Sequence, residues 1–224
     1  NSQTIYLDYA ATTPIAPQVL EAMMPYLTTC FGNPSSMDHQ FGKVAREGVE
    51  GARQQVADVL HSQASSVVFT SGGTESNNLA LRGIMYQHPD AHLVVSAIEH
   101  ASVLDSARRL ERDGVSVTYV NPNQEGTITV EAVEAAIQPN TTLVSVMWGN
   151  NEVGTINDIQ AIATMCHNKG ILVHSDAAQG VGHLAVDANI VDLLTLTGHK
   201  LYAPKGVGAL IVKDKMIISD GYNG

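Results

Sequence analysis

The stretch V-H-S-D-A-A-Q-G (residues 173–180), followed by L-L-T-L-T-G-H-K (193–200) and L-Y-A-P-K (201–205), indicates the fold most clearly. Its two apolar runs, residues 171–174 and 193–196, have the length, β-branching and leucine content of buried strands. Polar residues and a glycine follow each run. In an open α/β sheet, groups just past the carboxyl ends of the strands converge on the ligand crevice.

Five polar side chains follow these two predicted strands: Asp176 and Gln179 after the first, and Thr197, His199 and Lys200 after the second. A partly desolvated lysine can form a Schiff base with a carbonyl compound. A carboxylate facing it can keep a pyridinium nitrogen protonated, which pyridoxal phosphate requires. Taken singly, a solvated surface lysine and a turn or cap aspartate explain the residues equally well. Together, with Gln179 one helical turn beyond Asp176, they favour a cofactor site.

The composition is that of an ordinary globular protein of one large domain or slightly more: 224 residues, 44% hydrophobic and 15% charged. The net charge of −10 argues against a general nucleic-acid binder. No apolar run approaches the roughly 18 residues of a membrane span, and the N-terminal residues lack a signal-peptide pattern. Two cysteines offer no disulfide framework. We therefore expect a cytoplasmic protein that binds neither nucleic acid nor membrane.

Apolar runs and helical patterns alternate along the rest of the chain. This alternation predicts a three-layer α/β fold, with a mostly parallel sheet between helices on both faces. The further strands are expected at residues 5–9, 67–70, 93–96, 115–120, 143–147 and 208–212, and the helices at 17–27, 39–60, 71–85, 101–112, 130–137 and 159–168.

The motif S-G-G-T-E-S (71–76) lies where a predicted strand meets a predicted helix. Gly73 lets the backbone approach an anion, the N–H groups of the first helical turn point at it, and Thr74 adds a hydroxyl. A plain helix cap explains the same residues. The motif is neither G-x-G-x-x-G nor a Walker A loop, which disfavours a nucleotide-binding enzyme.

Two further loops follow predicted strands. His100 could stack on a flat ring or move protons near neutral pH, or it could be a solvated histidine at a helix start. The loop W-G-N-N-E-V-G (148–154), which contains Asn151, suits a ligand-facing loop or a tight turn. Polar, glycine-containing loops thus follow five predicted strands, and their agreement favours one shared site more than any single loop does.

The cysteines and the remaining histidines are interpreted as structural or solvated. Cys166 lies on an apolar helical stripe, which predicts a core position. Cys30 lacks cationic neighbours that would activate it. His61, His88 and His92 are expected at the surface. The spacing of His167 and His174 indicates no metal site, because one lies on a predicted helix and the other in a predicted strand.

The chain resembles the N-terminal part of a cysteine desulfurase, a pyridoxal-phosphate-dependent enzyme of the class-V aminotransferase-like family. The resemblance implies the large domain of pyridoxal-phosphate fold type I for residues 16–224, with residues 1–15 on the side of a small domain whose C-terminal part is absent. The matching stretches cover nearly the whole chain in the expected order: Y-L-D-Y-A-A-T-T-P, F-G-N-P-S-S, H-Q-F-G, F-T-S-G-G-T-E-S-N-N-L-A, E-H-A-S-V, N-N-E-V-G-T, H-S-D-A-A-Q-G and T-G-H-K-L-Y-A-P-K-G-V-G-A-L.

The resemblance also implies roles for single residues. Lys200 would carry pyridoxal 5′-phosphate as a Schiff base, Asp176 would pair with the pyridine nitrogen, and Gln179 would bond the phenolic oxygen. His100 would stack on the ring and act as an acid–base group. The cofactor phosphate would be held by Gly73, Thr74, Thr197 and His199. Asn151 would lie near the substrate and the ring oxygen. The family often has serine where Thr197 stands, a change that keeps the hydroxyl.

The implied reaction converts L-cysteine to L-alanine and leaves the sulfur as a persulfide on an enzyme cysteine. An acceptor protein would take it for iron–sulfur clusters or tRNA thiolation, and the family implies a homodimer. The alternatives are a related fold-type-I lyase or aminotransferase, such as a selenocysteine lyase, and a non-catalytic scaffold that keeps the fold.

The resemblance has one gap. In the family, the persulfide cysteine, a substrate-binding arginine and a phosphate contact from the neighbouring subunit come from sequence beyond the position of Lys200. The tail I-S-D-G-Y-N-G (218–224) does not resemble the expected continuation. Neither Cys30 nor Cys166 stands at the nucleophile's position. We therefore expect a fragment or a natural truncation, which alone would bind cofactor poorly and would not turn over cysteine.

Overall fold

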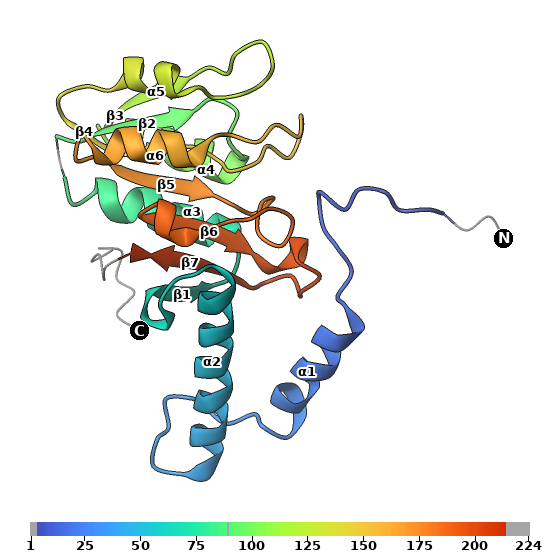
Figure 1. Cartoon of the computed structure of the whole chain (residues 1–224). Helices are drawn as coiled ribbons and strands as arrows, with labels where there is room; N and C mark the ends of the chain where they lie inside the picture. Colours follow the sequence, from blue (N-terminus) through green and yellow to red (C-terminus); the bar gives the residue numbers. More distant parts are fainter. Residues whose placement is uncertain (1–3, 89, 214–224) are drawn as a thin grey trace.

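A computed structural model describes residues 4–88 and 90–213. A seven-stranded sheet forms its centre, in the spatial order β1-β7-β6-β5-β4-β2-β3 (Figure 1). The strands are short runs rich in Val, Leu and Ile, and β2, β6 and β7 are buried along their whole length. Their bounds are Val67–Thr70 (β1), His92–Ser96 (β2), Ser116–Val120 (β3), Thr141–Ser145 (β4), Leu172–Asp176 (β5), Leu193–Thr197 (β6) and Gly208–Val212 (β7).

The sheet is mostly parallel, as the alternation of elements predicts. Strands β3, β2, β4, β5 and β6 pair in parallel, each with the next. Strand β7 runs antiparallel to both of its neighbours, β6 and β1. The carboxyl ends of the central strands β4, β5 and β6 therefore meet at one edge of the sheet, where a ligand crevice is expected.

Helices cover both faces of the sheet, which gives three layers (Figure 1). Helices α2 (Gln40–Val59), α5 (Val130–Ala136) and α6 (Ile159–His167) contribute to one apolar core. Helices α3 (Gly73–Met85) and α4 (Ala101–Arg112) contribute to the other. Because successive strand residues point to opposite faces, neighbours in one strand divide between the two cores. Val94 lies in the first core, and Leu93 and Val95 lie in the second.

The N-terminal part of the chain lies apart from the sheet. Helix α1 (Pro17–Thr28) contributes no buried residue and stands beside α2 in Figure 1. The strand predicted at residues 5–9 is wrong. The segment pairs with no described strand, and the side chains of Ile5 and Leu7 are 78% and 86% exposed. An apolar run without a neighbouring strand gains no ladder of backbone hydrogen bonds.

The prediction that His92 lies at the surface is also wrong. Its side chain is fully buried, and its two ring nitrogens lie 2.8 Å from the hydroxyls of Thr141 and Thr118. Burial lowers the pKa of His92, so a neutral ring is favoured there. The core position predicted for Cys166 is confirmed, and burial raises the pKa of that thiol to about 12. Such a thiol is unreactive near neutral pH.

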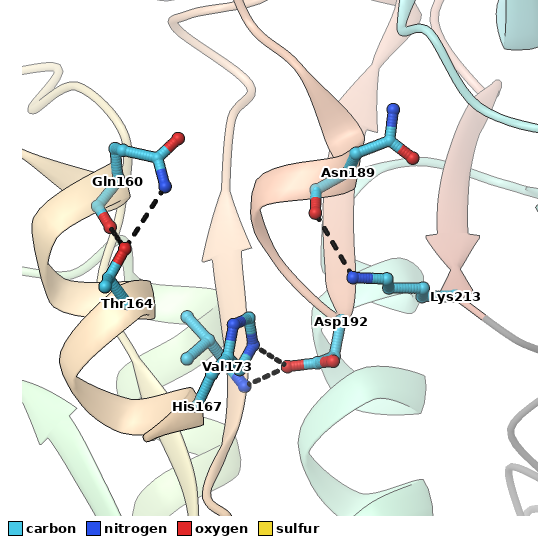
Figure 2. A network of polar contacts seen from close by, with 7 residues as sticks. All are labelled: Gln160, Thr164, His167, Val173, Asn189, Asp192 and Lys213. Carbon is cyan, nitrogen blue, oxygen red and sulfur yellow. Dashed lines mark hydrogen bonds and ion pairs between the residues drawn. The ribbon is translucent and has the colours of Figure 1, made fainter. Parts of the chain in front are cut away.

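A polar network lies at the edge of the sheet opposite the crevice (Figure 2). Asp192, just before β6, accepts hydrogen bonds of 2.8 Å from the backbone N–H of Val173 and from Nε2 of His167. The backbone N–H of Lys213 donates to the Asp192 carbonyl at 2.9 Å, and its ammonium group reaches the carbonyl of Asn189. The network ties α6, β5, β6 and the end of β7 together.

Within the residues that the structure describes, no helix is long and apolar enough to cross a bilayer. The same residues contain no group of three or more His, Cys, Asp and Glu side chains arranged to hold a metal ion. The tail at residues 218–224 lies outside the described residues, and the division of the chain at residue 15 stays a prediction.

Candidate active site

A cavity of about 440 Å³ opens at the carboxyl ends of β4, β5 and β6, beside the N-terminus of α3. All the site residues predicted from the sequence line it, although more than a hundred positions of the chain separate the first from the last. They are Gly73, Thr74, His100, Asn151, Asp176, Gln179, Thr197, His199 and Lys200.

Lys200 and Asp176 come to this cavity from neighbouring strands. Lys200 ends the short 3-10 turn Gly198–Lys200 that follows β6, and it is half-buried. Burial lowers the pKa of Lys200, and the negative charge of Asp176 partly opposes that shift. Asp176 ends β5 and is 5% exposed. Its carboxylate accepts hydrogen bonds from the backbone N–H of Ala178 at 2.9 Å and from Nδ2 of Asn77 at 2.8 Å.

The N-terminus of α3 forms one wall of the cavity at Gly73 and Thr74. The first N–H groups of a helix have no acceptor within the helix, and the helix dipole favours an anion beside them. Gly72 precedes the helix at φ 151°, a conformation that favours glycine. A Cβ atom on Gly208 would come 2.7 Å from the Gly72 Cα, so β7 requires glycine to pack against this turn. Thr197 lies across from Gly73, with its side chain buried.

His100 is both a helix cap and a residue of the cavity wall. It precedes α4, and its Nδ1 accepts a hydrogen bond from the backbone N–H of Ser102 at 3.1 Å. The ring also lines the cavity. The two interpretations of this histidine from the sequence are thus compatible, because capping uses one ring nitrogen and leaves the other for the cavity.

The loop after β4 brings Asn151 to the cavity, and its neighbour Asn150 holds the loop in place. Asn150 is buried, donates to the carbonyl of Ile98 at 2.9 Å, and accepts the backbone N–H groups of Glu152 and Val153. Of the two interpretations of this loop, a ligand-facing loop and a tight turn, the structure supports both: Asn150 stabilises the turn and Asn151 lines the cavity.

The N-terminal segment, residues 8–13, contributes Asp8, Ala10 and Ala11 to the cavity wall and was not assigned to the site from the sequence. Gln179 donates to the Ala10 carbonyl at 2.9 Å, and Nδ1 of His199 lies 3.0 Å from the Thr12 hydroxyl. The His199 carbonyl accepts the backbone N–H of Thr13 at 2.8 Å. Burial, and then the positive charges nearby, lower the pKa of His199.

Comparison with known proteins identifies the family of this chain. The family model described as aminotransferase class-V matches residues 5–219. The chain belongs to the class-V aminotransferase family. Proteins named cysteine desulfurase IscS from Shewanella sp. (strain W3-18-1) and Shewanella amazonensis are 51% and 50% identical to it over 217 residues. Each alignment covers 94% of this chain and 54% of the relative. The chain thus spans about half the length of these curated relatives.

Solved structures agree with this assignment of family and fold. A structure described as SspA in complex with cysteine is 43% identical with a TM-score of 0.92, over 94% of this chain and 62% of the other. A NifS-like protein is 34% identical, also with a TM-score of 0.92, over 96% and 60% of the two chains. The class-V chain therefore has the fold of the pyridoxal-phosphate fold type I large domain, as the sequence predicts.

Three buried residues of this class-V site were missed in the sequence. Asn77 lies one helical turn after Gly73, on the same face of α3, and its side chain reaches Asp176 and Ser102. Glu99, 5% exposed, accepts the backbone N–H of Met147. Burial raises the pKa of Glu99 well above its ordinary value, and the charge of Asp176 adds to the shift. Helical spacing from Gly73 was the available signal for Asn77. Ser102 and Glu99 depend on how α4 packs, which the sequence does not state.

Proposed function

We propose that this chain is the cofactor-binding part of a pyridoxal-phosphate-dependent cysteine desulfurase. One observation carries the proposal: a half-buried lysine with a lowered pKa shares a cavity with a buried carboxylate and a helix N-terminus. Aldehyde, pyridine nitrogen and phosphate are the three groups of the cofactor that these features match. A non-catalytic scaffold would have no physical reason to keep an amine desolvated there.

The residues of the cavity fit the cofactor group by group. Lys200 would hold it covalently and Asp176 would face its ring nitrogen. Gln179 would bond the ring oxygen, and His100 would lie against the ring face. For the phosphate the cavity offers helix N–H groups, hydroxyls and an imidazole, from Gly73, Thr74, Thr197 and His199. The bound cofactor would supply an electron sink for the bonds at the substrate Cα.

The lowered pKa of Lys200 suits its proposed role, because only the neutral amine is a nucleophile. The same amine would take up or release a proton at Nζ when it is not attached to the cofactor. The negative charge of Asp176 raises the pKa of Lys200 and so partly offsets the lowering by burial. Asn151, on the other side of the cavity, would contact the substrate.

We propose L-cysteine as the substrate, with L-alanine and enzyme-bound sulfur as products. Support comes from the two Shewanella relatives, which bear the name cysteine desulfurase, and from the related structure that contains cysteine. Cys166 is buried in the core and Cys30 does not line the cavity. We therefore infer that a thiol outside this sequence receives the sulfur. A sulfur-acceptor protein, a homodimer and a cytoplasmic location complete the proposal.

The test is an assay of alanine and sulfide formed from L-cysteine, with the chain alone and with the chain joined to the C-terminal half of a Shewanella relative. We expect turnover from the joined protein and none when Lys200→Ala is introduced. Lys169→Ala is the matched control, because Lys169 pairs with Glu134 on the surface. Cofactor-loaded joined protein that makes no alanine, or keeps its rate with Lys200→Ala, contradicts the proposal. Release of selenide from selenocysteine without sulfide from cysteine identifies the related lyase instead.

A further inference from the structure

A series of hydrogen bonds along the wall of the cavity joins the two proposed cofactor contacts, Asp176 and His100. Nδ2 of Asn77 lies 2.8 Å from Oδ2 of Asp176 and 2.9 Å from Oγ of Ser102. The Ser102 hydroxyl in turn lies 2.8 Å from Nδ1 of His100. Asn77 and Ser102 are 1% and 8% exposed, so the two middle residues of this hydrogen-bonded series are shielded from water.

The carboxylate of Asp176 dictates which way the Asn77 amide points. Both oxygens of Asp176 act as acceptors, one for the backbone of Ala178 and the other for Asn77. An amide oxygen placed against that carboxylate would be repelled, so the atom facing Asp176 must be the amide nitrogen. Its two N–H groups are then both used, one for Asp176 and one for the Ser102 hydroxyl oxygen.

That orientation fixes the next link. Because Oγ of Ser102 accepts from Asn77, its own hydrogen is free to point at Nδ1 of His100. The backbone N–H of Ser102 donates to the same Nδ1 at 3.1 Å. A ring nitrogen that receives two donors carries no hydrogen, so the single proton of the neutral imidazole lies on Nε2.

We propose that Asn77 is a positioning residue that holds His100 as the Nε2–H tautomer through Ser102. The inference rests on the proposed function for its catalytic meaning: His100 then presents a hydrogen-bond and proton donor to the cavity, and proton uptake at Nδ1 has to displace Ser102. The charge of Asp176, which would face one side of the cofactor, thereby sets the proton position of the histidine that would face its ring.

The unused oxygen of Asn77 supports this assignment. Its Oδ1 is buried and accepts no hydrogen bond from the part of the chain that the structure describes. A buried acceptor without a partner is destabilising and calls for an explanation. An apolar residue could fill this position without leaving a buried acceptor unpaired. A residue that is needed for its two amide N–H donors must also place the amide oxygen there.

The test uses the ligand-free 224-residue chain labelled with 15N-histidine, in which two-bond 1H–15N spectra distinguish the two tautomers. His100→Gln identifies the His100 signals among those of the nine histidines. The decisive variant is Asn77→Asp, which keeps the shape and leaves an oxygen opposite Ser102. When charged, or when its proton is donated to Asp176, that oxygen accepts the Ser102 hydrogen and withdraws it from His100. Asn78→Asp, next along α3 and bonded to the Thr74 carbonyl, is the matched control.

We expect the wild-type chain to show His100 protonated at Nε2 and bare at Nδ1. Loss of one ordinary hydrogen bond should lower the ratio of the Nε2–H to the Nδ1–H form in Asn77→Asp between about twofold and tenfold. Asn78→Asp should leave the ratio unchanged. A wild-type proton on Nδ1, or an unchanged ratio in Asn77→Asp, overturns the proposal.

Ser102→Ala gives a second route if Asn77→Asp loses its dispersed amide spectrum. It removes the hydroxyl donor and keeps the backbone one, so the ratio should fall in the same direction; an unchanged ratio contradicts the proposal. None of these spectra needs cofactor. The expected tautomer, together with a joined protein that fails to bind pyridoxal phosphate, would therefore refute the proposed function and leave this inference standing. The reverse pair of results would refute only the inference.

Discussion

The two ends of strand β5 each have a nearby aspartate, but the surroundings of the two differ. Near the first residues of β5, Asp192 is bonded to His167 and to the backbone of Val173 (Figure 2). At the last residue, Asp176 is held by Ala178 and Asn77 but faces a cavity that also contains an amine of lowered pKa. Satisfied polar groups indicate a structural role, whereas polar groups directed at empty space indicate a ligand.

The difference extends to the buried acids and histidines. His92, at the amino-terminal edge, has both ring nitrogens bonded to threonine hydroxyls. At the carboxyl-terminal edge, Glu99 keeps one buried oxygen without a hydrogen bond from the described residues, and its pKa is raised by burial and by Asp176. His92 and Asp192, at the first edge, are therefore both bonded within the fold. At the second edge, Glu99 keeps unfavourable interactions, with its burial and with the charge of Asp176.

The largest expected effect is a difference in cofactor affinity between variants of the two aspartates. Asp176→Asn should weaken pyridoxal phosphate binding at least about 100-fold, because removing one partner of a buried charged pair is strongly destabilising. Asp192→Asn, the same change at the other end of β5, should leave the affinity unchanged. Equilibrium dialysis measures both. Equal affinities for the two variants would remove the distinction between the edges.

The next effect concerns the stability of the fold, and here Asp192 is expected to matter. Asp192→Ala leaves the Val173 N–H without its side-chain acceptor and breaks the contact with His167. We expect the free energy of unfolding in urea to fall by about 1–3 kcal/mol. Asp105→Ala, which removes an exposed aspartate paired with Arg108, serves as the control and should change little. A loss no larger than in the control would show that the network is not a structural clamp.

The smallest effect concerns Glu99 and depends on pH. Because the folded state raises the pKa of Glu99, the unfolded state releases the proton first as pH rises above about 4.5, and the wild type loses stability there. Glu99→Gln cannot ionise. Its stability relative to the wild type should therefore increase from pH 4 to pH 8, as measured by urea unfolding at each pH.

The exposed residue Glu125 provides the control for this prediction, since Glu125→Gln should show no such trend. A relative stability of Glu99→Gln that stays flat, or decreases, over the same pH range would show that the buried acid is not held protonated by the site.

The sequence predicted the elements of the sheet well, because each buried strand is a local apolar run and each helix has its own periodicity. It did not predict strand order, such as β7 between β1 and β6, since pairing depends on distant segments. For the same reason the run at residues 5–9 was taken for a strand and His92 for a surface residue. Neither the partner of a strand nor the depth of a side chain is encoded locally.

For the site, the rule that ligands bind past the carboxyl ends of strands, together with the resemblance, located every site residue predicted from the sequence at one cavity. The residues that were missed act through others. Asn77 and Ser102 reach the site from helix faces, and the hydroxyl and backbone N–H of Thr13 donate to the His199 carbonyl across 186 positions of the chain. Their placement follows from how helices and the N-terminal segment pack, which no motif of adjacent residues encodes.

The central claim is that Lys200 is the covalent attachment point of pyridoxal phosphate. The most direct test incubates the chain, joined to the C-terminal half of a Shewanella relative, with the cofactor, reduces the mixture with borohydride and maps the modified lysine by peptide mass spectrometry. We predict a pyridoxyl group on Lys200 that is absent in Lys200→Arg. The amount of this adduct should decrease when excess phosphate competes with the cofactor. A chain that carries no adduct, or carries it equally on surface lysines such as Lys169, would contradict the account.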